Sequence, residues 1–103
     1  MLASSLAADR RDMDFEWDEA KSDARFASDG FGFDVAALVF EGPTLEWPDD
    51  RRDYGERRMI ALGAVDGIVL VVVYTDRGDV RRIISARPAN RKERQRWRLF
   101  AGL

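Results

Sequence analysis

The sequence predicts an α+β fold with two N-terminal helices, a three- to four-stranded antiparallel sheet and a C-terminal helix. Three observations predict this class. A run dense in β-branched residues, 67–75, follows the hairpin dipeptide Asp66-Gly67. Short segments with helix-like spacing of apolar residues come before the strands, and a charged segment with helical spacing follows Pro88. Strands joined by tight turns, with helices grouped before and after them, are typical of the α+β class.

The two N-terminal helices are predicted from their end signals. Asp18 is a suitable N-cap, because its carboxylate can accept hydrogen bonds from the first free amides of a helix. That helix is expected to stop near Gly30. A second short helix is expected over 33–40, and it ends at Gly42-Pro43 because proline cannot continue a helix.

The strands are predicted from β-branched residues and turn signals, at 44–47, 57–65, 67–75 and 80–87. The third is expected to be buried on both faces, because nearly all of its residues are apolar. A second turn is expected at 76–79. The last strand is expected to end before Pro88, which has no amide hydrogen to give to a sheet. A helix is expected from Ala89 onward.

Simple alternation divides the last strand into two faces. One face is expected to hold Arg81, Ile83, Ser85 and Arg87, and the other Val80, Arg82, Ile84 and Ala86. Because one face must meet the helices, the two arginine pairs cannot share a role.

Two missing residue types limit the chemistry of the chain. It has no cysteine and no histidine. Disulfides, thiolate zinc sites, histidine metal ligation and histidine acid–base catalysis are therefore excluded. Any catalysis must use carboxylates, Lys, Arg, Tyr, Ser or Thr, and we expect neither a metal nor a cofactor.

The organisation of the chain is predicted to be simple. No apolar run approaches the roughly 20 residues that span a bilayer. The first charges follow the short N-terminal apolar stretch, which is the wrong order for a secretory signal. We expect a cytoplasmic protein that does not bind membranes. Residues 1–12 are expected to be a disordered extension, and 13–103 a single domain.

Charge is divided unequally between the two halves of the chain. Residues 1–56 carry 15 acidic and 6 basic side chains, net −9, whereas residues 57–103 carry 4 acidic and 11 basic side chains, net +7. One interpretation is that the basic half binds a polyanion or an acidic partner. The other is that the two halves neutralise each other within one fold.

Four segments carry a resemblance to a known family: FEWDEAK (15–21), RRDYGERR (51–58), VVYTDRG (72–78) and RRIISARPANRKER (81–94). In this order and at this spacing they resemble the BrnT family, which are toxins of bacterial type II toxin–antitoxin systems. The resemblance covers about residues 13–98 and rests on the four motifs together.

The resemblance implies a RelE-like fold in a single BrnT-like toxin domain at 13–103. It implies an endoribonuclease that cuts RNA and thereby inhibits translation. It also implies a BrnA-like antitoxin with a ribbon-helix-helix domain. Toxin and antitoxin of that family form a heterotetramer that contacts operator DNA only through the antitoxin.

One segment departs from the family pattern. After the first helix the family usually reads Asn-x-x-Lys-His-Gly, whereas residues 25–30 keep only Gly30, and Ser28 and Asp29 stand in place of Lys-His. One interpretation is a catalytically weakened homologue, which acts as an antitoxin-binding module in autoregulation of its operon. The other is that the chemistry never needed those positions.

Cleavage of RNA without a metal needs a base for the 2′-hydroxyl and cations for the phosphoryl oxygens. Glu56 is the predicted base, because Arg57 and Arg58 beside it would lower its pKa and favour the carboxylate. The alternative is a surface carboxylate that pairs with an arginine across the sheet.

Arginines are the predicted phosphate ligands, because the guanidinium fork matches phosphate oxygens two at a time. Arg58, Arg77 and Arg87 are assigned to the catalytic group. The residues predicted to bind RNA are Lys21, Arg82, Ser85, Arg91, Lys92 and Arg94. The three on the final helix suit an RNA backbone or an acidic antitoxin segment. Asn90 and Glu93 are expected to cap that helix.

Overall fold

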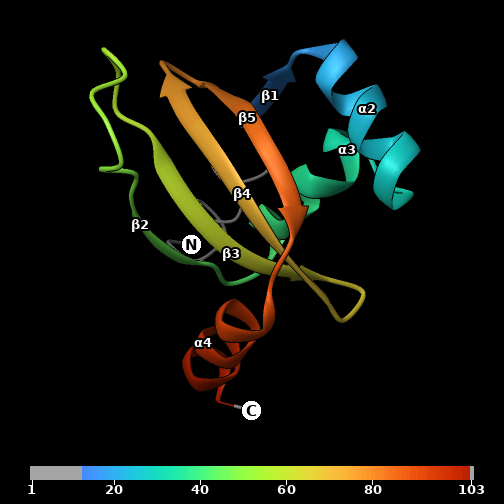
Figure 1. Ribbon diagram of the computed structural model, residues 1–103. Coiled ribbons are helices and arrows are strands. Elements are labelled where there is room, and N and C mark those ends of the chain that lie inside the picture. The colour runs from blue at the N-terminus through green and yellow to red at the C-terminus, as the bar shows by residue number, and fades with distance from the viewer. Residues whose placement is uncertain (1–12, 103) are drawn as a thin grey trace, which may run out of the picture.

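The structure is a computed structural model that describes residues 13–102. The expected disordered extension at 1–12 lies outside the described residues. In chain order the elements are β1 (Asp14–Trp17), α2 (Glu19–Asp29), α3 (Phe33–Ala36), the 3-10 helix η1 (Ala37–Glu41), β2 (Leu45–Pro48), β3 (Met59–Val65), β4 (Ile68–Arg77), β5 (Val80–Pro88) and α4 (Arg91–Ala101). The predicted α+β class is confirmed, with helices before and after the run of strands β2 to β5 (Figure 1).

The strands form one five-stranded sheet in the order β1-β5-β4-β3-β2. Every neighbouring pair is antiparallel except β1 and β5, which run parallel. The prediction of a three- to four-stranded antiparallel sheet was therefore wrong, because it lacked β1, the strand that pairs parallel with β5. Strand β1 has four residues, too few to show an alternation pattern. It is stabilised by pairing with a strand more than sixty positions away in the sequence, where Glu16 lies opposite Arg82.

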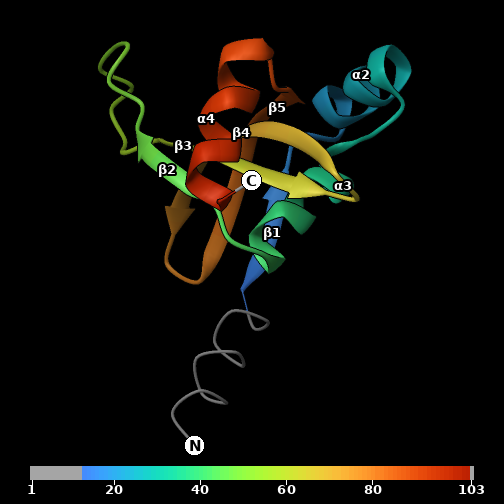
Figure 2. The same ribbon diagram turned by 90° about the horizontal axis from the view of Figure 1, so that it is seen from below.

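The two faces of the sheet are covered by different helices, with α3 and α4 on opposite sides (Figure 2). The α3 side holds the larger apolar cluster, which includes Phe33, Val39, Phe40 and Ile83. The α4 side holds a smaller cluster around Leu62, Val71 and Trp97. The central strand β4 contributes to both clusters and is buried from Leu70 to Thr75, which confirms the expected double burial.

An irregularity in β5 changes which side chains share a face. Tyr74 lies opposite Ile83, but Val73 lies opposite Ser85, so Ile84 is an extra residue in β5. The predicted faces were wrong for this reason. Ser85 and Arg87 lie on the side of Arg82, because all three are opposite the β4 residues on the α4 side of the sheet.

The predicted turns and caps are largely confirmed. Asp66 and Gly67 both have positive φ, 51° and 81°, as a two-residue type I′ hairpin requires. The Asp18 carboxylate accepts hydrogen bonds from the first amides of α2. Asn90 and Glu93 form a capping box at the start of α4. No helix within residues 13–102 is long and apolar enough to cross a membrane.

Gly63 marks a close approach between β3 and η1. A Cβ added there would lie 2.7 Å from the Cβ of Val39, so Gly63→Ala should destabilise the fold by about 1–3 kcal/mol through overpacking. Gly42→Ala is the matched control, because a Cβ at Gly42 meets nothing within 4 Å. Urea denaturation of the two variants tests this; equal midpoints would contradict the packing described here.

Candidate active site

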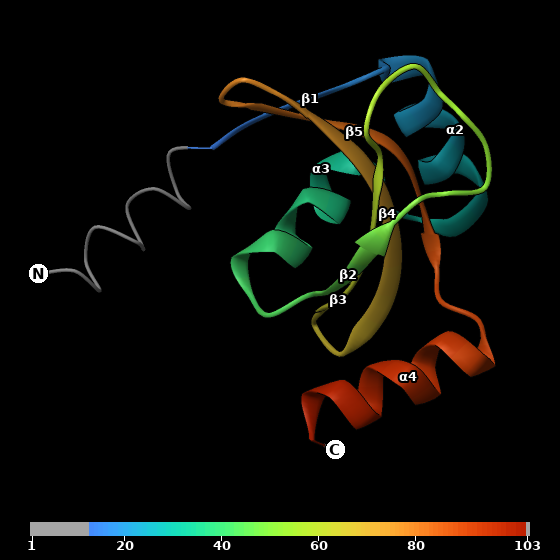
Figure 3. The ribbon, with the colours of Figure 1, turned by 90° about the vertical axis from the view of Figure 1, so that its left-hand side faces the viewer.

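The α4 side of the sheet is covered unevenly. Helix α4 lies at one end of the sheet, whereas the loop at residues 49–58 extends from the other end (Figures 1 and 3). Near that loop, charged side chains instead of a helix lie on the strands. The β4 residues Val73 and Thr75 are buried beneath them, 6% and 3% exposed.

Five side chains form a continuous line of ion pairs across this end of the sheet, which we call the charge chain: Arg58, Glu56, Arg77, Glu16 and Arg82. The Arg58 Nε lies 3.1 Å from one Glu56 oxygen, and an Arg77 nitrogen lies 3.3 Å from the other. Arg77 also reaches Glu16 at 3.9 Å. Glu16 in turn lies 3.3 Å from Arg82. The charge chain therefore holds three cations and two anions.

The members come from three strands and one loop. Glu16 and Arg82 are direct neighbours across the parallel β1–β5 pair, and Arg77 ends the adjacent strand β4. Glu56 and Arg58 both belong to the 49–58 loop, which precedes β3. The Arg77 side chain is 58% exposed. A phosphate from solvent can therefore reach the centre of the charge chain.

The 49–58 loop is anchored so that Glu56 faces the sheet. The Thr75 hydroxyl donates to the Arg57 carbonyl at 2.7 Å. The two ends of the loop are joined directly, because the Asp49 amide donates to the Arg58 carbonyl at 2.8 Å. The Asp49 carboxylate is buried and accepts two 2.7 Å bonds from Arg51, which lower the pKa of Asp49 to about 2.

Thr75 is thus expected to position the loop. Thr75→Val keeps the volume but removes the hydroxyl that holds Arg57, and should cost about 1 kcal/mol of unfolding free energy. Thr75→Ser keeps the hydroxyl and is the matched control. Chemical denaturation measures the difference between the two variants; a Val variant as stable as the Ser variant would argue against this anchor.

The electrostatics at Glu56 favour its ionised form. Hydrogen bonds from Arg58, and then from Arg77, hold the pKa of Glu56 below its ordinary value. The direction agrees with the sequence expectation, but one partner differs. Arg57 is exposed and forms no ion pair within residues 13–102, and Arg77 takes that place from across the sheet. A carboxylate held in this way is ionised at neutral pH.

The remaining cations do not join this group. Arg87 forms a two-point ion pair with Glu93, both contacts at 2.8 Å, at the start of α4. It lies five residues beyond Arg82 along β5, which is roughly 16 Å at about 3.3 Å per residue. Arg94 donates to the Ala89 carbonyl. The exposed Arg91 and Lys92 lie on α4 as well.

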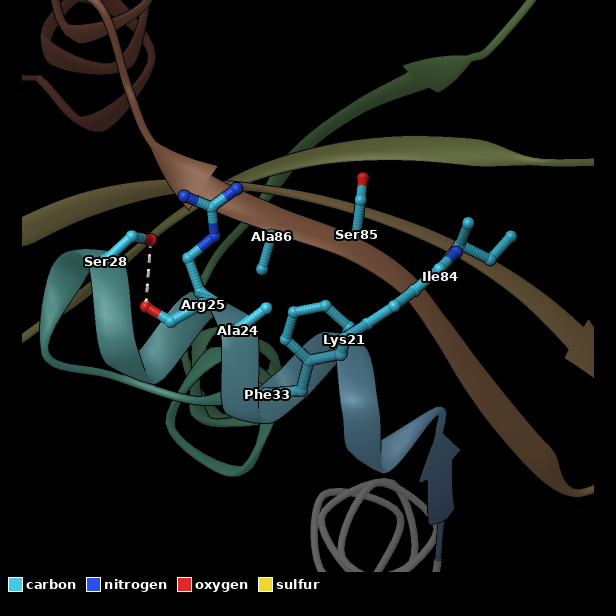
Figure 4. A pocket seen from close by; sticks show the side chains of 8 residues that line it. All are labelled: Lys21, Ala24, Arg25, Ser28, Phe33, Ile84, Ser85 and Ala86. Atoms are coloured by element: carbon cyan, nitrogen blue, oxygen red, sulfur yellow. Dashed lines mark hydrogen bonds between the residues drawn. The ribbon is translucent and has the colours of Figure 1, made fainter.

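The other predicted RNA-binding residues, Lys21 and Ser85, line a cavity of about 300 Å³ between α2 and β5 (Figure 4). Ser28 from the departing segment also lines it. The Ser28 hydroxyl and the Arg25 guanidinium both bind Asp29, at the end of α2. No contact within the described part of the chain joins Ser28 or Asp29 to the charge chain.

Two features of the site were missed from the sequence. Glu16 was not considered because β1 was not predicted, although it lies within the FEWDEAK segment. The role of Arg81 was also open. The Arg81 guanidinium lies on the α3 side of the sheet, 4.0 Å from the centre of the Tyr74 ring, and forms an ion pair with Asp76. Arg81 therefore supports the core, whereas Arg82 belongs to the charge chain.

The comparisons with known proteins give one family. Its model, described as ribonuclease toxin, BrnT, of type II toxin-antitoxin system, matches residues 17–93, well over half of the chain. The matched region contains four of the five members of the charge chain, and Glu16 directly precedes it. No curated protein matches the chain. Within residues 13–102, no group of three or more carboxylates is arranged to hold a metal ion.

Proposed function

Because this chain belongs to the BrnT family of ribonuclease toxins of type II toxin–antitoxin systems, we propose that it is an endoribonuclease whose charge chain cuts RNA without a metal ion. The observation that carries this proposal is the position of Glu56. Its carboxylate lies between the guanidinium groups of Arg58 and Arg77 on an accessible part of the sheet. A proton acceptor is thereby held beside two phosphate ligands.

The proposed reaction begins with displacement of an ion pair by the scissile phosphate. The Arg77–Glu16 contact is the longest in the charge chain, 3.9 Å, so it is the weakest one to open. The phosphate then binds Arg77 and Arg82 from the side of Glu16. Because Glu16 and the phosphate are both anions, the exchange conserves the pairing of the cations.

Glu56 then takes the proton of the 2′-hydroxyl, and the 2′-oxygen attacks the adjacent phosphorus in line. The negative charge that develops on the phosphoryl oxygens is stabilised by Arg77 and Arg82, which hold the phosphate, and by Arg58 on the other side of Glu56. The bond from phosphorus to the 5′-oxygen breaks, which leaves a 2′,3′-cyclic phosphate and a 5′-hydroxyl. In this scheme water protonates the leaving oxygen, because arginine, with a pKa above about 12, is a poor proton donor.

The test is cleavage of RNA by the purified full chain in EDTA. We expect cutting to continue, with 2′,3′-cyclic phosphate and 5′-hydroxyl ends, and to stop at a linkage that carries a 2′-deoxyribose. RNA left whole by folded protein would overturn the enzymatic proposal. Cutting that required a divalent cation would overturn the proposed chemistry.

A toxin of a type II system has an antitoxin partner, and the substrate of a ribonuclease toxin is RNA. We further propose a BrnA-like antitoxin, a heterotetrameric complex that contacts operator DNA through the antitoxin alone, and inhibition of translation in the cytoplasm. A RelE-like fold in a single domain at 13–103 is part of the same proposal. Support comes from the sheet flanked by helices and from the exposed Arg91 and Lys92 on α4, which suit an acidic antitoxin segment.

A second candidate function is an antitoxin-binding module with weakened cleavage. The observation that favours it is that Ser28 and Asp29 occupy the Lys-His positions, where the Asp29 carboxylate accepts hydrogen bonds from Ser28 and Arg25. Against it, the charge chain makes no contact with them and is complete. Expression of the chain without an antitoxin distinguishes the two. Growth arrest supports the ribonuclease, whereas normal growth with retained antitoxin binding supports the module.

A further inference from the structure

Helix α2 faces the sheet with an unusual set of side chains. Lys21, Ala24, Arg25 and Ser28 follow the i, i+3, i+4, i+7 spacing of one helix face, which is normally apolar where a helix packs on a sheet. The only buried residue of α2 is Ser22. Polar and small side chains therefore stand where large apolar ones would fill the space, and a cavity remains.

This cavity has an apolar floor and charged ends. Beside the four α2 residues it is lined by Phe33 and by three successive residues of β5, Ile84, Ser85 and Ala86, and its volume is about 300 Å³. Figure 4 shows the Lys21 and Arg25 side chains reaching from α2 toward β5. Such a combination suits a flat, largely apolar group that carries anionic groups at its edges.

The irregularity in β5 connects the cavity with the charge chain. Since Ile84 is the extra residue, Ser85 shares the α4 side of the sheet with Arg82, whereas Phe33 and Ala86 of the cavity belong to the α3 side. The pairing of β1 with β5 ends at Ile83, so Ser85 lies at an edge of β5 that β1 does not cover, roughly 10 Å along the strand from Arg82. A single RNA strand with a phosphate at Arg82 could pass over this edge and place a neighbouring nucleotide at the cavity.

We propose that this cavity is a base subsite, which takes the unstacked base of a nucleotide flanking the scissile phosphate. Proteins recognise single-stranded RNA in this manner, with a splayed base against apolar side chains and hydrogen bonds to its edge. Phe33, Ala24 and Ala86 provide the apolar contact, and Ser28 lines one end of the cavity (Figure 4). Lys21, exposed and in no ion pair within residues 13–102, binds the phosphate of that nucleotide.

The size of the cavity selects this occupant. A volume of about 300 Å³ is at the lower limit for small-molecule sites, which suits one base. An extended peptide segment needs a longer groove. The inference rests on the proposed function, because it assigns the base to a strand whose phosphate lies at the charge chain.

The test is binding of the four nucleoside 3′-monophosphates to the full chain, followed by NMR. We expect the amide signals of Ala24, Ser85 and Ala86 to shift, with one base preferred. Ala24→Leu, which fills the cavity, should weaken binding of the preferred nucleotide about tenfold or more. Ala27→Leu is the matched control, because Ala27 is exposed on α2 and does not line the cavity.

A second variant keeps the proposal falsifiable if Ala24→Leu folds poorly. Lys21→Ala should weaken all four nucleotides by a similar factor, because it removes a phosphate contact and leaves the base contacts. The inference would be overturned if nucleotides shifted only amide signals outside the cavity. It would also be overturned if both variants bound nucleotides with the affinity of wild type. A Leu variant that lost antitoxin binding and kept nucleotide binding would overturn it as well, since the cavity would then be a protein interface.

The outcome separates this inference from the proposed function. RNA cutting with the same site preference in wild type and Ala24→Leu would overturn the subsite and leave the ribonuclease standing. Nucleotide binding at the cavity without any RNA cutting would support the subsite as a nucleotide site and overturn the ribonuclease.

Discussion

Glu56→Gln should lower the rate of RNA cleavage by about 10² to 10⁴, the usual contribution of a general base. The amide has the size of the carboxylate, and its carbonyl oxygen can still accept a hydrogen bond from Arg58 or Arg77. It cannot take the proton of the 2′-hydroxyl. Single-turnover cleavage of a short RNA measures the effect. The control is Glu41→Gln, at an exposed carboxylate outside the charge chain.

The pH dependence provides a second measure of the same group. Because Arg58 and Arg77 lower the pKa of Glu56, the base form persists below the ordinary pKa of a glutamate. Wild-type cleavage should fall only when acid titrates this lowered pKa. Arg58→Ala removes the larger cause of the shift, so the acid limb of its profile should move to higher pH. An acid limb at the same pH in both proteins would count against Glu56 as the base.

Arg77→Ala should lower cleavage by about 10² to 10³, as expected for loss of a donor that stabilises transition-state charge. Arg77 is the one member of the charge chain that contacts both carboxylates. Arg77→Lys should recover only part of the rate, because an ammonium cannot present two parallel donors to a phosphate. Arg57→Ala, at a neighbouring exposed arginine, should cleave as wild type does.

The fold should tolerate the loss of Arg77. Its side chain is 58% exposed, and such pairs contribute little to stability. Each carboxylate also keeps a partner, Glu56 with Arg58 and Glu16 with Arg82. The melting temperature of Arg77→Ala should therefore change little, although its rate of RNA cleavage falls strongly. A large fall in melting temperature together with a normal rate in the folded fraction would assign Arg77 a purely structural role.

Local signals predicted the middle of the fold well. The β-branched run of β4, the Asp66-Gly67 hairpin and the Asn90 cap each depend on residues close together in sequence, and each is present. Helix α2 was predicted because Asp18 is its cap. Such features follow from backbone preferences and from local patterns of apolar residues, both of which can be recognised in a short segment of the sequence.

Long-range features were not predicted. Strand β1 exists because it pairs with β5, and four residues carry no pattern of their own. The extra residue Ile84 follows from the packing of Ile83 and Ala86 in one core cluster, which alternation alone cannot reveal. Together these two features decide which arginines share a face.

The site was predicted in part for the same reason. Arg58, Arg77 and Glu56 lie together in the structure, and Arg82 joins them through Glu16. Arg87 instead pairs with Glu93 at the other end of the sheet. Composition indicated that arginines gather in the second half of the chain. Only the register of β5 separates the arginines of the charge chain from those that hold α4.

A double-mutant cycle on Glu56 and Arg77 tests most directly whether the charge chain is one catalytic unit. Cleavage rates are measured for wild type, Glu56→Gln, Arg77→Ala and the combined variant, all confirmed to be folded. If the two side chains act on the same phosphate, the combined variant should be about as slow as the slower single variant. Losses that multiply, or single variants that cut as fast as wild type, would contradict the proposed site.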